Sequence, residues 1–83
     1  MKLTEAQRRV LKALAGGDVI LHIGGINARQ WLRGTGKPVN WTTSTILLRA
    51  GLIESFYAGP LSADKDYRIT ALGRTVLREA GDD

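Results

Sequence analysis

The stretch that decides the fold is Trp41 to Glu54, which reads WTTSTILLRAGLIE. A helix that begins after Asn40 would have apolar residues at i, i+3, i+4 and i+7, the spacing of one buried stripe. Gly51 would end this helix, because glycine adopts the left-handed conformation that closes helices. The apolar residues that follow would then begin a buried strand. The predicted stripe is Thr43, Ile46, Leu47 and Ala50, and the opposite side carries Thr42, Thr45 and Arg49.

The N-terminal segment from Leu3 to Ala15 predicts a first helix. Thr4 is its N-cap, with Gln7 three residues on as the capping-box partner, and Gly16-Gly17 ends it. The buried stripe is expected to contain Val10, Leu11 and Leu14, with either Ala6 or Gln7. An outward cationic side, formed by Arg8, Arg9 and Lys12, is more typical of solubility than of phosphate contact.

Residues 19–33 have two interpretations. In the first, Val19 to Ile23 is a β-branched strand, Gly24-Gly25 is a turn, and alternating residues form a second strand. In the second, Asn27 to Gln30 is a capping box that opens a short helix in the position a helix-turn-helix would use, and Gly34 stops it. We favour the hairpin, without discarding the helix. Gly34 to Pro38 is a loop in either case.

Two further strands and a last helix are expected after Gly51. The strands are Leu52 to Tyr57 and Asp66 to Thr70, joined by a loop over residues 58–65. Thr70 is the predicted N-cap of the last helix, and residues 81–83 are expected to fray. The predicted buried face of that helix contains Leu72, Val76 and Ala80, with Leu77 at its edge.

Two motifs carry a resemblance to a known family. The first is the helix that ends in Gly51-Leu52-Ile53, and the second is Asp66 to Arg74, DYRITALGR. Together they resemble the winged-helix domains of small bacterial and phage transcription regulators. There a recognition helix ends in such a turn, a two-stranded wing follows, and a Tyr-x-Ile-Thr strand leads into another helix. The resemblance implies an α+β domain of three or so helices with a C-terminal hairpin wing followed by a last helix, here with an extra hairpin at 19–33.

Size and composition predict one domain spanning residues 1–83 and argue against several functions. The chain has a single histidine and no cysteine, which excludes a disulfide framework and a thiolate metal site. Carboxylates that could act with His22 lie mostly toward the chain ends, so we expect neither an enzyme nor a cofactor or metal. There is no apolar leader and no run of about 20 apolar residues. We therefore expect a cytoplasmic protein that does not enter a membrane.

The charge distribution favours a polyanionic partner. The chain carries a net charge of +4, and no Asp or Glu occurs between Val19 and Ile53. Acidic residues gather toward the C-terminus instead, and such a polarised charge can concentrate nucleic acid on one face.

Double-stranded DNA binding is the function that these patterns predict. Short side chains with hydrogen-bond donors and acceptors, near the start of a recognition helix, can reach base edges in the major groove. Arg49 could contact guanine or a phosphate. The wing is less basic than such a role requires, because Asp64 and Asp66 flank its cations. A homodimer would suit a regulator of this size. The predicted contacts are Asn40, Thr42, Ser44, Thr45 and Arg49 in the helix, Arg29, Arg33 and Lys37 before it, and Lys65 and Arg68 in the wing.

The alternative is a protein-binding module of the same fold, for instance a phage factor that docks on a host protein. One fold hosts many functions, so the resemblance alone does not decide between them. Trp31 and Trp41 are both expected in the core, since tryptophan in a small domain is usually buried. An exposed tryptophan would instead mark a contact surface.

Overall fold

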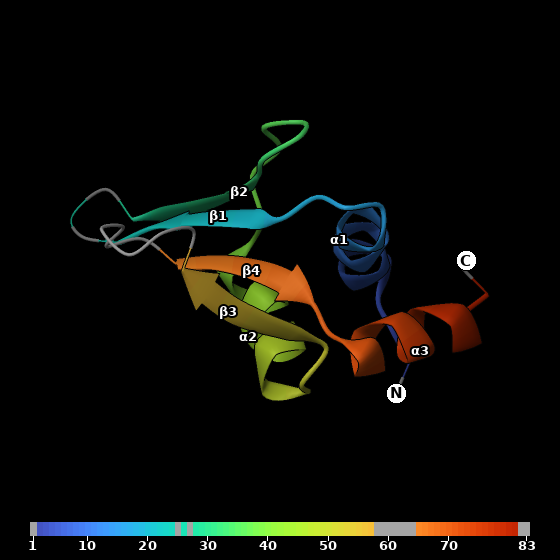
Figure 1. The fold of residues 1–83 in the computed structure, drawn as a ribbon. Helices are drawn as coiled ribbons and strands as arrows, with labels where there is room; N and C mark the ends of the chain where they lie inside the picture. The colour runs from blue at the N-terminus through green and yellow to red at the C-terminus, as the bar shows by residue number, and fades with distance from the viewer. Residues whose placement is uncertain (1, 25, 27, 58–64, 82–83) are drawn as a thin grey trace.

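A computed structural model describes residues 2–24, 26, 28–57 and 65–81, with the side chains of residues 57 and 65 left out. It shows an α+β arrangement of three helices and one four-stranded antiparallel sheet (Figure 1). The elements follow in the order α1 (Glu5–Ala15), β1 (Ile20–Ile23), β2 (Arg29–Leu32), α2 (Trp41–Arg49), β3 (Ile53–Tyr57), β4 (Lys65–Ile69) and α3 (Ala71–Glu79).

The sheet has the strand order β2-β1-β4-β3. Two antiparallel hairpins, β1–β2 and β3–β4, meet because β1 also pairs with β4, and Ile20 lies opposite both Leu32 and Tyr67. The hairpin interpretation of residues 19–33 is therefore confirmed, and the short helix is wrong. Residues 29–32 pair with β1 along their whole length, and β1 also pairs with β4, so the sheet takes up the segment that the alternative assigned to a helix.

The core lies on one face of this sheet. Side chains alternate along a strand, so Ile20, Leu32 and Ile53 point to the same face. Helix α1 covers them with Leu11 and Leu14, and it also contacts α2, α3 and β4. The most deeply buried side chains are Leu11, Leu14, Ile20, Leu47, Leu52 and Ile53.

All three predicted helix caps are confirmed. Thr4 and Gln7 form a reciprocal capping box, with nitrogen–oxygen distances of 3.2 and 3.0 Å. Asn40 accepts the Thr42 N–H at 2.8 Å, and Thr70 accepts the Gly73 N–H at 3.0 Å. The side chain of each cap satisfies a backbone donor that has no partner within its helix.

The buried faces of the two later helices differ from the predicted ones. In α2, Leu47 is fully buried, but Ile46 is 38% exposed and Ser44 takes the second inner position. In α3, Leu77 and Gly73 are buried, while Leu72 is 52% exposed and Ala80 is also exposed. Both helices are only nine residues long, so a small rotation about the axis decides which apolar residue faces the core.

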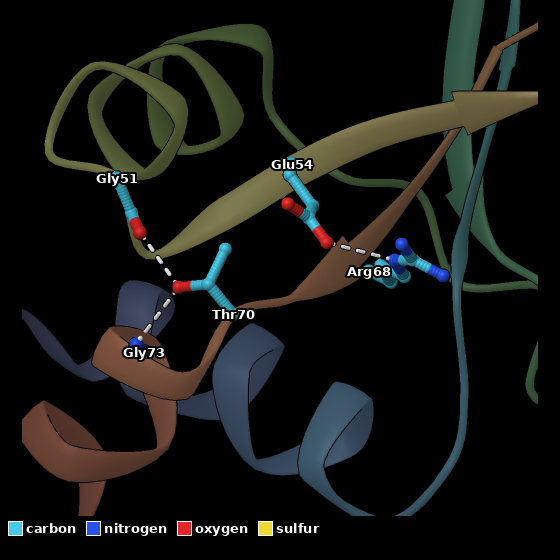
Figure 2. A network of polar contacts seen from close by, with 5 residues as sticks. All are labelled: Gly51, Glu54, Arg68, Thr70 and Gly73. Atoms are coloured by element: carbon cyan, nitrogen blue, oxygen red, sulfur yellow. Dashed lines mark hydrogen bonds and ion pairs between the residues drawn. The ribbon is translucent and has the colours of Figure 1, made fainter.

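The strands of the predicted wing occur within one residue of their expected ends. They are β3 and β4, whereas most of the loop that joins them, residues 58–64, lies outside the described residues, as does part of the predicted frayed end. Gly51 precedes β3 with a φ of +75°, so it has the predicted left-handed conformation. Its carbonyl accepts the Thr70 hydroxyl at 2.6 Å, as Figure 2 shows. This bond joins the end of α2 to the start of α3.

Gly73 is the position where the packing tolerates no side chain. A Cβ there would overlap the carbonyl oxygen of Leu52 and come within 2.7 Å of Ile69 Cγ1. We expect Gly73→Ala to destabilise the fold by about 3 kcal/mol, because backbone has to move to admit the methyl group. Thermal unfolding followed by circular dichroism would show a fall in Tm of about 10 °C or more.

Gly16→Ala is the matched control. Gly16 has a φ of −80°, and the nearest atom to its added Cβ, Ala13 O, is 3.4 Å away. Its Tm should change little. Equal Tm values for the two variants would show that the Gly73 contact is not required for the fold.

Candidate nucleic-acid interface

Helix α2 is attached to the sheet by one apolar and one polar anchor. Leu47 is fully buried in the core. One turn earlier, the Ser44 hydroxyl donates to Gln30 Oε1 at 2.6 Å, and both residues are buried. The Gln30 amide nitrogen lies 3.1 Å from His22 Nδ1, so a neutral His22 accepts there when its proton is on Nε2. A continuous polar chain therefore runs from α2 through β2 to β1.

This attachment leaves a polar stripe on the outer side of α2. Thr42, Thr45 and Arg49 are exposed, and their spacing of three and four residues puts them on one helix face. Helix α2 contains no acidic residue. The stripe can donate and accept hydrogen bonds and carries one positive charge.

Apolar side chains flank the stripe on both sides. Trp41 and Leu48 are 44% and 42% exposed, and Ile46 is 38% exposed. At 100° per residue, Trp41 and Leu48 fall on one flank and Ile46 falls on the other. The outer surface of α2 is thus more apolar than the sequence pattern predicted.

A hollow lined by two basic and otherwise mainly apolar residues, here called the basic hollow, lies beside the start of α2. It encloses about 160 Å³, and Arg9, Lys37 and Asn40 are among its lining residues. Lys37 is held there by the backbone, because its carbonyl accepts the Leu32 N–H at 2.9 Å. Arg9 approaches Glu5 at 3.4 Å, but both side chains are largely exposed, so this pair is weak and leaves Arg9 able to reorient.

The predicted site residues divide between two surfaces. Asn40, Thr42, Thr45 and Arg49 are exposed on α2 or at its cap, with Lys37 nearby. Arg29 and Arg68 are exposed, but they lie on the opposite face of the sheet from α2 and do not join this site. Arg33 is exposed in the turn after β2, and the side chain of Lys65 lies outside the described residues.

The expected roles of Ser44 and Trp41 are wrong in opposite ways. Ser44 was predicted to face DNA, yet it is only 4% exposed, because the buried Gln30 takes its hydroxyl. Trp41 was predicted in the core, yet it is 44% exposed and contacts His22 edge-on with ring centroids 5.2 Å apart. Trp31 is half-buried on the open face of the sheet.

The described residues contain no group of three or more side chains that could hold a metal ion. His22 is half-buried and packs edge-on against both Trp41 and Tyr67. Its hydrogen bond to Gln30 agrees with the packing role that its apolar strand indicates. Among the same residues, no helix has the length and hydropathy needed to span a bilayer.

Comparisons with protein-family models, with curated proteins and with solved structures found no match.

Two features of the site could not be recognised from the pattern alone. The sequence pattern places Arg9 on a solvated helix side, and only the fold brings it beside Lys37. Gln30 looked like one residue of an alternating strand, but it bonds to Ser44, fourteen positions away. The one signal in the sequence for this contact is a glutamine at an inward strand position, because a buried amide requires hydrogen-bond partners.

We expect Ser44→Ala to destabilise the protein by about 1–3 kcal/mol, because the buried Gln30 oxygen would lose its donor. Urea unfolding monitored by circular dichroism would measure this loss. Thr45→Ala is the matched control, since Thr45 is exposed on the same helix and alanine favours helix formation. A Ser44→Ala protein as stable as Thr45→Ala would mean that the polar chain does not anchor α2.

Proposed function

We propose that this protein binds double-stranded DNA with the outer face of α2 and acts as a small cytoplasmic transcription regulator. The observation that carries the proposal is the exposed stripe of Thr42, Thr45 and Arg49 on a helix without acidic residues. Hydroxyl groups can contact either kind of base pair, and arginine pairs with guanine or phosphate.

The shape of α2 suits this role. The major groove of B-DNA is about 12 Å wide, which is enough to admit an α-helix. The nine residues of α2 give it an axial length of about 13 Å. The N-terminal end of the helix is exposed, and recognition helices commonly contact bases from that end. Asn40 contributes less than its position suggested, because its side-chain oxygen already accepts the Thr42 N–H.

Lys37 and Arg9 are the proposed phosphate contacts. Both line the hollow beside the start of α2, so they could hold the DNA backbone while α2 lies in the groove. These contacts would position the protein and make its affinity dependent on salt, without reading sequence.

The architecture proposed for this function is a winged helix in which the β1–β2 hairpin stands where a helix-turn-helix has its first helix. The β3–β4 hairpin would be the wing. Arg68 pairs with Glu54 and lies on the far face, so the wing would contribute little to DNA affinity. A regulator of this size suits a phage or mobile element, and a homodimer would match operators with two-fold symmetry.

Replacing Arg49 and Lys37 together by alanine should weaken binding to a mixed-sequence duplex. Each lost phosphate contact should reduce the steepness of log K against log salt by about 0.9. Fluorescence anisotropy over a series of salt concentrations would measure both the affinity and the slope.

The control is the double variant Lys2→Ala and Arg78→Ala. It removes the same charge from exposed positions near the two ends of the chain. Equal losses in the two double variants would show that only net charge matters. Unchanged affinity after loss of Arg49 and Lys37 would remove the proposal.

A second candidate function is protein binding through the same helix, for instance to a host protein. The apolar flanks Trp41, Ile46 and Leu48 favour it, because exposed apolar groups together on one element often mark a protein contact. Leu72, at the start of α3, is also exposed and lies close to Gly51, which extends the apolar surface.

Under this alternative, the tagged wild-type protein should recover a partner at fixed stoichiometry. Leu48→Glu should abolish that recovery, because the partner's apolar contact is lost. Lys12→Glu, on the exposed side of α1, should leave recovery unchanged. Pull-down followed by mass spectrometry provides the measurement. If neither the wild type nor the control retains a protein, this alternative is contradicted.

A further inference from the structure

The face of the sheet opposite α2 carries a row of side chains that neither proposed function uses. The strand register puts Trp31 opposite Leu21, Leu21 opposite Asp66, and Asp66 opposite Phe56. The row therefore crosses the whole sheet, with an aromatic ring on each outer strand. We call the surface formed by this row together with Arg29 and Arg68 the open sheet face.

This face is separate from the core. The buried residues of β1 and β2, Ile20 and Leu32, point to the other face, where α1 and α2 lie. On the open sheet face, Trp31, Leu21 and Phe56 are half-buried, and the neighbouring Ile23 is 37% exposed. The aromatic rings are fixed by the strands and remain partly accessible.

An arginine guanidinium packs over each aromatic ring. The Arg29 guanidinium lies 4.7 Å from the centroid of the Trp31 ring, and that of Arg68 lies 5.0 Å from the centroid of the Phe56 ring. Both arginines are exposed. An arginine in this position can extend the stacking surface with its own plane or turn outward to a phosphate.

The acidic groups on this face are largely neutralised or covered. Glu54 pairs with Arg68 at 2.9 Å, as Figure 2 shows, and Asp66 is only 7% exposed. Arg68 and Glu54 therefore largely offset each other, and Arg29, beside Trp31, is the main accessible positive charge of this face. This combination is complementary to a ligand that has both flat aromatic groups and negative charge.

We propose that the open sheet face binds a single-stranded nucleic acid. Unpaired bases can stack on Trp31 and Phe56, while Arg29 contacts a phosphate. Arg68 can do the same only by giving up its contact with Glu54. The two rings are three strand spacings apart, about 14 Å, which leaves room for two or three bases. A duplex cannot bind in this way, since its base faces are covered by neighbouring base pairs.

The chain offers a direct optical test. It contains two tryptophans, so Trp41→Phe leaves Trp31 as the only one, and Trp31→Phe leaves only Trp41. The probe is an oligothymidylate of about 12 nucleotides, within the range of single-strand sites. Stacking should quench the fluorescence of the Trp41→Phe protein and leave that of the Trp31→Phe protein unchanged. A duplex of the same length and inorganic polyphosphate should not quench either protein.

Affinity for the oligonucleotide gives a second readout. Arg29→Ala should bind about tenfold more weakly, because a charge and part of the stacking surface are lost. Arg78→Ala removes the same charge from an exposed position on α3 and should bind normally. Circular dichroism would verify that each variant is folded.

Four results would overturn the proposal. The first is unchanged Trp31 fluorescence at low salt in a folded protein. The second is an equal loss of affinity in Arg29→Ala and Arg78→Ala, which would indicate a general charge effect. The third is a protein dimer that shields Trp31 without nucleic acid. The fourth comes from Arg49→Ala, which separates this proposal from duplex binding by α2. This substitution should weaken only duplex binding. Weaker binding of the oligonucleotide would place the nucleic-acid strand on α2 and refute binding by the open sheet face.

Discussion

The contact between Thr70, Gly51 and Gly73 is the constraint on which the arrangement of the helices depends. The Thr70 hydroxyl donates to the Gly51 carbonyl and accepts the Gly73 N–H, while the Thr70 N–H donates to the Leu52 carbonyl. One residue thereby joins the end of α2, the start of β3 and the first turn of α3 (Figure 2). The missing side chain at Gly73 allows this approach, because Leu52 occupies the place that a Cβ would need. The orientation of α2 follows from this junction.

A short helix in a small domain needs more than one anchor. Helix α2 buries a single large apolar side chain completely, Leu47, and the Ser44–Gln30–His22 chain supplies the second attachment. Buried polar groups stabilise a structure only when they are paired, and then they also specify its geometry. The same hydroxyl that would have made Ser44 a candidate base contact is used to orient the helix, so the proposed recognition of DNA depends on the exposed residues around it.

The sheet separates two surfaces of different character. The α2 side presents hydroxyls, one arginine and apolar flanks on a convex helix, and the basic hollow lies beside its first turn. The open sheet face presents two rings with arginines on a strand platform. The proposed ligands differ accordingly: a groove of duplex DNA for the first surface, and unpaired bases for the second. Because the surfaces lie on opposite faces of the sheet, substitutions on one can leave the other intact.

Local signals in the sequence determined the helix caps, the glycine that ends α2, the strand positions and the α+β class. These depend on residues within a few positions of one another, such as Thr4 with Gln7, and on alternation within a strand. Only the tertiary structure decided that β1 pairs on both sides, that Ser44 turns inward and Trp41 outward, and that Arg29 and Arg68 lie away from α2. The reason is physical: a nine-residue helix can bury either of two adjacent stripes. The choice depends on partners such as Gln30, which is distant in sequence and meets Ser44 only after the sheet has formed.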